Sequence, residues 1–474
     1  MTTFFHAFRF VVKYGVLHSC SKGVFYINKK TYSLWTATTM IVGICIGSGI
    51  FFKVDDILSF TGGNVLLGTM IFIIGALAII FGSISLTSLS VRTTNSGGMV
   101  GYFEAFFSNK MASAFGWFQT FLYYPTIAVV VSWAAGIYTC MLFGLDNTLN
   151  RQMLLGLGYL LLFYAINILS VKAGGYFQVL STVTKLIPLI GIGLLGFFWT
   201  KEAPPIPEGV AVKELTDVGW GWLAALAPAA FSYDGWPIAL SITNEVKNPK
   251  RNMPLALVIG PLVVLVVYLA YFLGMNAILG PQFIISTGDD AVMTLGYMLF
   301  GELGSTILLI FVLIAILGVV NGVLLGHLRM PQALASKGLI PDAERIRQID
   351  LKRSLSMPSA KVSVVCSLFW YAVHYVTQLT GIMAPGDVSE IAIVFGYACY
   401  FLLYVKVMQL YRQKDITNVF LGVVAPLLGM LGSVIIVLGG FLANPLSMSL
   451  FAAICFFFCL AGYLYADKHA TAAS

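Results

Sequence analysis

The sequence has 474 residues, of which 59% are hydrophobic and only 10% are Asp, Glu, Lys or Arg. A soluble domain carries about 25% charged residues, so this composition excludes a soluble globular protein of this length. The net charge is +7, and the positions of the basic residues indicate membrane topology rather than nucleic-acid binding.

Apolar runs recur along the chain, each of about 20 residues, which is long enough for a helix to cross roughly 30 Å of hydrocarbon. The short alternating segments typical of barrel strands are absent. We therefore predict an all-α membrane protein with about 12 transmembrane helices in one bundle. The predicted spans are 33–60, 65–91, 113–143, 151–170, 175–200, 219–244, 254–279, 300–335, 360–380, 387–411, 418–441 and 446–466.

Residues 1–30 are predicted to form a cytoplasmic N-terminal leader. Phe4–Leu17 mixes apolar residues with His6, Arg9 and Lys13, a pattern typical of a short interfacial helix. A signal peptide is the competing interpretation, but no small-residue cleavage site follows the apolar run.

Lys and Arg residues fall almost entirely on one side of the predicted bundle. The N-terminus and every second loop contain 22 of them, whereas the loops on the other side contain 3. Because short cytoplasmic loops are enriched in basic residues, both termini are predicted to lie in the cytoplasm of a multi-pass cell-membrane protein. Attraction of this face to anionic lipid is a further consequence.

The first span contains a cluster of small residues, Gly43–Phe51, with three glycines and Ser48 within seven positions. Such a cluster permits an unwound turn, which is tolerated in a membrane only where other groups satisfy the freed backbone. The alternative is tight helix packing through small residues.

The sixth span contains a second irregular segment, Ala227–Pro237, with two prolines, a glycine and Asp234. Ser48 and Asp234 are 186 positions apart, about five spans. Two broken helices at this spacing are typical of a five-plus-five inverted repeat with its substrate site at the membrane midplane. We expect the repeats at about 31–200 and 219–411, with 412–474 forming two accessory helices and a tail.

The two breaks together suggest a receptor for a zwitterion. A half-helix starting near Gly49 would present unpaired N–H groups to a carboxylate. Carbonyl groups freed near Ile44, Cys45, Phe231 and Ser232 would accept hydrogen bonds from an ammonium group. The predicted ligand is therefore an amino acid.

Three motifs also carry a family resemblance: Gly47–Phe51, Phe231–Trp236, and Asn244–Pro249 followed by Arg251 and Pro254. With these motifs the chain resembles the amino acid–polyamine–organocation superfamily over nearly its whole length. Within the superfamily it is most similar to bacterial relatives of the L-type amino acid transporters, the light subunits of heteromeric transporters. The resemblance implies a LeuT-type fold with helices 1 and 6 unwound. It also implies sodium-independent exchange of small neutral L-amino acids such as alanine, serine and cysteine.

Lys185 lies inside the apolar fifth span. Burying an ammonium group in a membrane costs free energy, so a functional role is the default hypothesis for this residue. The alternative is snorkelling to the cytoplasmic face. The resemblance implies that Lys185 reaches the unwound first helix and takes the place of a sodium ion, and that Phe231 is a lid over the substrate.

Tyr268, in the seventh span, is interpreted equally well as a gating residue or as ordinary packing. Tyr123 and Tyr124 either line the site or satisfy their hydroxyl groups against neighbouring backbone. The predicted substrate-binding residues are Ile44, Gly47, Ser48, Gly49, Phe231, Ser232 and Asp234, and the predicted coupling or gating residues are Lys185, Phe231 and Tyr268.

Two rival functions remain open. Proton-coupled symport would use Asp234 or Lys185, and a membrane-embedded enzyme would need a nucleophile–base pair or metal cluster that the isolated His327 and His374 do not supply. The seven cysteines lack metal-ligand spacing, so neither cofactor nor metal is expected. The loop Phe143–Arg151 contains no cysteine, so no disulfide-linked heavy subunit is expected.

Overall fold

The structure is a computed structural model that describes residues 33–47, 49–93, 98–236, 246–350, 353, 355–384 and 386–471. These residues are helical apart from connecting turns and loops and an isolated β bridge between Asp350 and Leu355. The helices are α2 (Leu34–Cys45), α3 (Gly49–Phe52), α4 (Val54–Phe60), α5 (Val65–Ser90), α6 (Met99–Phe106), α7 (Asn109–Phe118), η1 (Gln119–Tyr123), α8 (Tyr124–Leu142), α9 (Leu149–Leu169), α10 (Val171–Phe197), η2 (Gly219–Ala225), α11 (Leu226–Ser232), α13 (Pro249–Leu279), α14 (Pro281–Thr287), α15 (Asp290–His327), α16 (Met330–Ala335), α17 (Ala343–Ile346), α18 (Met357–Thr380), α19 (Val388–Arg412), η4 (Phe420–Val424), α20 (Ala425–Ala443) and α21 (Pro445–Thr471).

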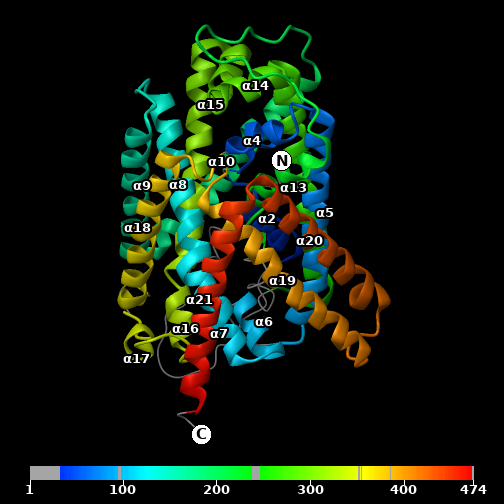
Figure 1. The fold of residues 1–474 in the computed structure, drawn as a ribbon, viewed down its shortest axis with the longest axis vertical. Helices are drawn as coiled ribbons and strands as arrows, with labels where there is room; N and C mark the ends of the chain where they lie inside the picture. The colour runs from blue at the N-terminus through cyan, green and yellow to red at the C-terminus, as the bar shows by residue number, and fades with distance from the viewer. Residues whose placement is uncertain are drawn as a thin grey trace.

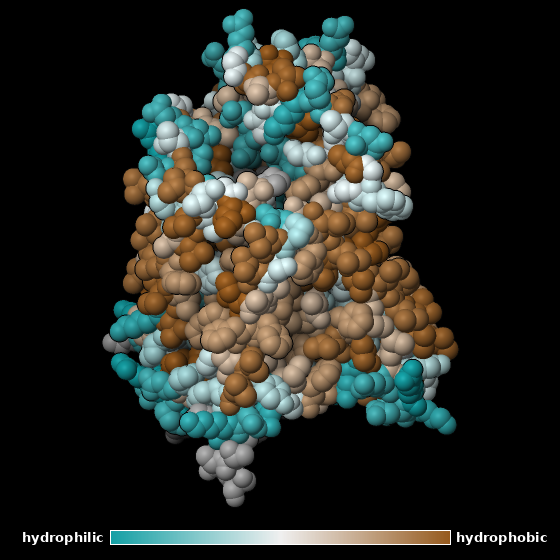
Figure 2. Space-filling model, in the orientation of Figure 1, coloured by the Kyte–Doolittle hydropathy of each residue, from teal (hydrophilic) through white to brown (hydrophobic). Residues whose placement is uncertain are grey.

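The described part of the chain contains ten helices that are long and apolar enough to cross a membrane. Figure 2 shows the consequence on the surface, a broad hydrophobic belt between two hydrophilic ends. Exposed Leu154, Leu194, Leu303, Val365 and Phe456, each on a different helix, contribute to the apolar surface. A surface this apolar is expected to face lipid rather than water.

The two predicted spans that are not among the ten are the first and the sixth, and the structure interrupts both. The segment 33–60 is divided into α2, α3 and α4. The described part of 219–244 is divided into η2, α11 and a turn, and residues 237–245 lie outside the described residues. Each piece is too short to span hydrocarbon by itself.

Both interrupted helices lie within the bundle of long helices (Figure 1). Helix α2 packs against α13 and α10, whereas α11 packs against α19, α20 and α3. Around them, α8 packs along α9, α15 and α18, and α5 packs along α13 and α20. Figure 1 shows α14 at one end of the bundle and α16 and α17 at the other, which are called here the α14 end and the α16 end.

The eighth predicted span differs from the structure at both ends. Helix α15 begins at Asp290, and its axis is broken at Phe300 and Gly301, where Gly301 has a φ of +68°. The predicted start at residue 300 coincides with this break, and residues 290–299 form an additional helical segment before it. At the other end the helix stops at His327, and residues 330–335 form the separate helix α16.

Candidate functional site

The first interruption leaves backbone carbonyl groups without their usual helical partners. Helix α2 ends at Cys45 and α3 begins at Gly49, and the described residues between them, Ile46 and Gly47, are not helical. The Gly43 carbonyl oxygen accepts a hydrogen bond from Lys185 Nζ at 2.8 Å, and the Cys45 carbonyl oxygen accepts one from the Tyr268 hydroxyl at 2.9 Å. Side chains therefore take over the backbone groups that the helix releases, which is the condition for an unwound turn in a membrane. Ile44 lies in α2, and Ser48 lies outside the described residues.

The second interruption follows α11. Helix α11 ends at Ser232, and Gly235 has a φ of +97°, a conformation that a residue with a side chain rarely adopts. The Ser232 carbonyl oxygen accepts a hydrogen bond from the Tyr268 hydroxyl at 2.7 Å. A proline-containing helix therefore stops at the position where the sequence predicts a break.

The two interruptions are in direct contact. A Cβ atom added to Gly49 would lie 2.4 Å from the Ser232 Cα atom, and one added to Gly47 would lie 2.8 Å from a Val319 methyl group. The glycines thus allow close packing as well as an unwound backbone, so the two interpretations of this cluster are both supported. A side chain at Gly49 would separate the two broken helices.

Tyr268 joins the two broken helices through one hydroxyl group. The ring is fully buried, and the hydroxyl oxygen lies within hydrogen-bond distance of the Cys45 and Ser232 carbonyl oxygens. Because a tyrosine hydroxyl has a single proton, it donates to one of the two at a time or divides the bond between them. Tyr268 therefore makes specific hydrogen bonds in addition to its packing contacts, and its gating role stays a prediction.

Lys185 lies inside the protein and does not snorkel. Its side chain is 1% exposed, and its ammonium group contacts the Gly43 carbonyl oxygen on the unwound first helix. Gly43 makes this approach possible, because a Cβ atom there would lie 2.6 Å from the Thr182 methyl group on α10. The geometry thus brings together α10 and the first interruption, as the resemblance implied.

Asp234 faces an aromatic group from another helix. Its carboxylate accepts a hydrogen bond from the Tyr123 hydroxyl at 2.5 Å. Tyr123 ends the π-helical turn η1, and π turns inside helices occur frequently at functional sites. In the same turn the Thr120 carbonyl oxygen lies 2.9 Å from His327 Nε2. Sequence reasoning left Asp234 and Tyr123 as separate candidates, and the structure pairs them.

The remaining singled-out residues have structural roles. His327 also contacts the Tyr164 hydroxyl through Nδ1 at 3.0 Å, and Tyr124 stacks on its ring. His374 packs edge-on against Trp133. Among the described residues, no group of three or more His, Cys, Asp or Glu side chains is placed to hold a metal ion.

Sequence reasoning missed a cluster of buried charges at the α14 end, which we call the outer latch: Lys53, Asp56, Asp387 and Glu390. Lys53 Nζ lies 2.8 Å from Asp387 Oδ2, 2.8 Å from Glu390 Oε1 and 3.1 Å from Asp56 Oδ2. A usable signal was present, because Lys53, Asp56 and Glu390 all fall inside predicted apolar spans, where charges are rare.

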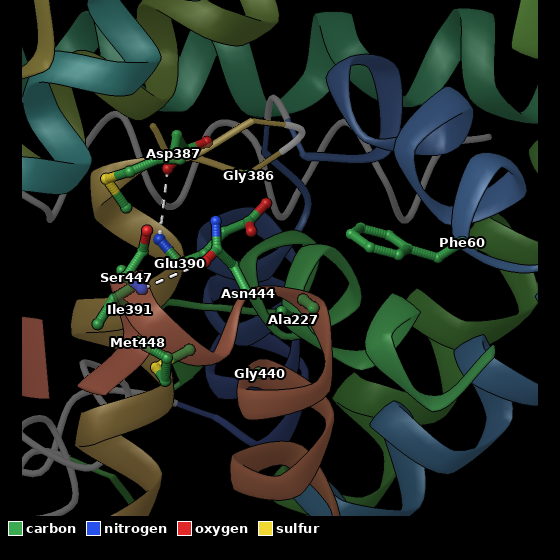
Figure 3. Close-up of a pocket in the computed structure, with 12 residues that line it drawn as sticks. Phe60, Ala227, Gly386, Asp387, Glu390, Ile391, Gly440, Asn444, Ser447 and Met448 are labelled. Carbon is green, nitrogen blue, oxygen red and sulfur yellow. Dashed lines mark hydrogen bonds between the residues drawn. The ribbon is translucent and has the colours of Figure 1, made fainter. Parts of the chain in front are cut away.

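A hollow lies beside the outer latch, with an empty volume of about 320 Å³, part of it open to solvent. Figure 3 shows Ile391 and Ser447 at one side of this hollow and Phe60 at the opposite side. The lining residues are Phe60, Ala227, Met383, Gly386, Asp387, Glu390, Ile391, Gly440, Ala443, Asn444, Ser447 and Met448. Two carboxylates of the outer latch therefore border the hollow.

Comparison with known proteins shows the family of this chain. The family described as amino acid permease matches residues 32–472. The serine/threonine exchanger SteT of Bacillus subtilis (strain 168) is 27% identical over 427 residues, covering 89% of this chain and 93% of that protein. The human b(0,+)-type amino acid transporter 1 is 27% identical, covering 92% of this chain and 87% of that protein. The human Asc-type amino acid transporter 1 is 28% identical, covering 66% and 60%. The resemblance noted in the motifs is confirmed, and the chain belongs to the amino acid permease family of the amino acid–polyamine–organocation superfamily, whose members transport amino acids across membranes.

Proposed function

We propose that this protein exchanges small neutral L-amino acids across the cell membrane by alternating access, without sodium. The observation that carries the proposal is the contact between two interrupted helices, with carbonyl groups of both, at Cys45 and Ser232, converging on one point. Facing breaks in two helices are the usual construction of a substrate site in transporters with inverted repeats. The five-plus-five division at about 31–200 and 219–411 is part of the same proposal.

The substrate would bind where the two breaks meet. Its carboxylate would accept hydrogen bonds from the backbone at Gly47 to Gly49, at the start of α3. Its ammonium group would donate to carbonyl groups at the ends of α2 and α11. Phe231, which is buried at the end of α11, would cover the substrate side chain and limit its size.

Sodium independence is proposed from Lys185. A fixed ammonium group already contacts a carbonyl oxygen at the first break, so a positive charge is supplied there by the protein itself.

A second function, proton-coupled symport, is favoured by a different observation, the carboxylate of Asp234 in the second break and its hydrogen bond from Tyr123. An exchanger does not need this carboxylate to change its protonation during transport.

The proposed orientation places the α16 end in the cytoplasm and the α14 end outside, with both termini cytoplasmic. It rests on the distribution of Lys and Arg residues. We also propose that the chain works without a disulfide-linked heavy subunit. Cys140, at the α14 end of α8, is fully buried, which supports this part of the proposal.

The test is uptake by purified protein in liposomes, with internal amino acid, sodium and pH gradient varied independently. Exchange predicts uptake of labelled serine or alanine that requires internal amino acid and is unchanged when sodium is replaced by choline. Uptake into empty liposomes driven by an inward proton gradient would favour symport. Uptake that depends on sodium would refute the proposal.

A further inference from the structure

The outer latch places one ammonium group among three carboxylates inside the protein. The side chains of Lys53, Asp387 and Glu390 are 2%, 3% and 6% exposed, and that of Asp56 is 19% exposed. A buried charge is tolerated when it is paired and hydrogen-bonded, and removing one partner leaves an uncompensated charge. Removing any one side chain of the outer latch would therefore weaken the pairing of the others.

The ion pairs join two separate moving parts of the proposed transporter. Lys53 lies between α3 and α4, in the half of the first broken helix that follows the interruption, and Asp387 and Glu390 begin α19. The partners are 334 and 337 positions apart in the sequence. These contacts hold the α3–α4 half-helix against the start of α19 at the α14 end.

Asp387 is fixed in place for this contact. Its Oδ1 atom caps α19 by accepting hydrogen bonds from the backbone amides of Ser389 and Glu390, at 2.8 and 3.3 Å. Its Oδ2 atom is directed at Lys53. The two oxygens thus have different partners, and the lysine binds a carboxylate whose direction the helix has already set.

Lys53 also contacts the proposed lid. Its ammonium nitrogen lies 5.3 Å from the centre of the Phe231 ring, a cation–π distance. Phe231 is followed directly by Ser232, whose carbonyl oxygen accepts the bond from Tyr268. Lys53 therefore contacts both the carboxylates at the start of α19 and the aromatic ring that covers the proposed site.

We propose that Lys53 is a positioning residue of the outer gate. Its ion pairs to Asp387 and Glu390, together with its contact to Phe231, keep the substrate site closed toward the α14 end, and these pairs separate when the site opens to that end. The proposal rests on the alternating-access function proposed above. The hollow lined by Asp387, Glu390, Asn444 and Ser447 would admit water to the separated carboxylates, which lowers the cost of opening.

The native thiol of Cys45 gives a direct readout of closure. Cys45 is 3% exposed and ends α2, so the first break lies between it and Lys53 along the chain. In a chain whose other six cysteines are replaced by serine or alanine, the rate of Cys45 modification by a membrane-impermeant thiol reagent, added to the α14 side in proteoliposomes, measures opening toward that side. The assay needs no substrate, so a failure of the proposed transport function is detected separately, as absence of amino acid exchange by the wild type.

Lys53→Gln should increase the rate of Cys45 modification from the α14 side by about tenfold, and Lys53→Arg should restore a rate near that of the parent. The matched control is Lys110→Gln, which removes an ion pair to Asp467 at the α16 end and should leave the rate unchanged. Substrate-induced thermal stabilisation distinguishes a change in gating from loss of the binding site. If Lys53→Gln changes gating alone, this variant should still be stabilised by substrate.

A folded Lys53→Gln protein with the parental modification rate would overturn the proposal. If Lys53→Gln does not fold, Glu390→Gln provides the test, because it leaves the pair with Asp387 in place and removes one contact of the latch. We expect a smaller increase in modification rate for Glu390→Gln, and an unchanged rate in that folded variant would equally overturn the gate.

Discussion

Replacing Lys185 by alanine should impair transport more than folding. In the structure its ammonium group donates to the Gly43 carbonyl oxygen inside the protein. A hydrogen bond to a charged group contributes about 1.5–3 kcal/mol, and a factor of ten in an equilibrium corresponds to about 1.4 kcal/mol. If the bond is present in only one of two transport states, its loss shifts their ratio by roughly ten- to a hundredfold.

The assay is amino acid exchange in proteoliposomes of matched protein content, comparing wild type, Lys185→Arg and Lys185→Ala at several sodium concentrations. We expect a lower exchange rate for Lys185→Ala and a change in apparent affinity that differs between the two faces of the membrane. Thermal unfolding in detergent checks that the variants are folded. Lys185→Ala transport equal to that of the wild type on both faces would refute the reasoning, and so would wild-type exchange that requires sodium.

Three further predictions concern the same site. Gly49→Ala places a methyl group 2.4 Å from the Ser232 Cα atom. We expect this variant to lose about 1–3 kcal/mol of stability and to lose substrate-induced thermal stabilisation. Gly47→Ala should be milder, because the nearest neighbour of its new methyl group is a Val319 methyl group. Tyr268→Phe removes the hydroxyl shared by two buried carbonyl groups; we expect a loss of about 1–2 kcal/mol in unfolding measurements and slower exchange, and an unaltered exchange rate would return Tyr268 to ordinary packing. Phe231→Ala should admit larger neutral amino acids and slow exchange of serine, measured by competition and initial rates, and unchanged selectivity and rate would contradict its role as a lid.

The interruptions were predictable because their causes are local. Glycines in the first span and prolines with Asp234 in the sixth weaken a helix wherever they occur, and no other part of the chain is needed to see it. The positions of the breaks, after Cys45 and after Ser232, fall inside the predicted segments. Lys185 was also visible, because a charge in the middle of an apolar span is unusual by itself.

Other features depend on distant parts of the chain and were not predicted. The π-helical turn Gln119–Tyr123 precedes Pro125, which marks a local irregularity, but the pairing of Tyr123 with Asp234 on another helix was not predicted. The break at Phe300 and Gly301 coincides with the predicted start of the eighth span, but the helical residues 290–299 before it were not predicted. Element boundaries therefore moved although the order of elements did not.

The outer latch shows why a charge pattern alone was insufficient. Lys53 and Asp56 stand near the end of a predicted span, where charges are commonly solvated, and Asp387 and Glu390 stand at the start of another. Each charge is unusual for an apolar span, but its own segment does not show which residue pairs with it. The pairing follows from the packing of α11 against both α19 and α4, which buries Lys53, Asp387 and Glu390 together. Buried charges of this kind are tolerated only when they are paired. The ion pairs join the α3–α4 half-helix to the start of α19. In the gate proposed above, these two segments move apart when the site opens toward the α14 end, so the buried pairs must then separate.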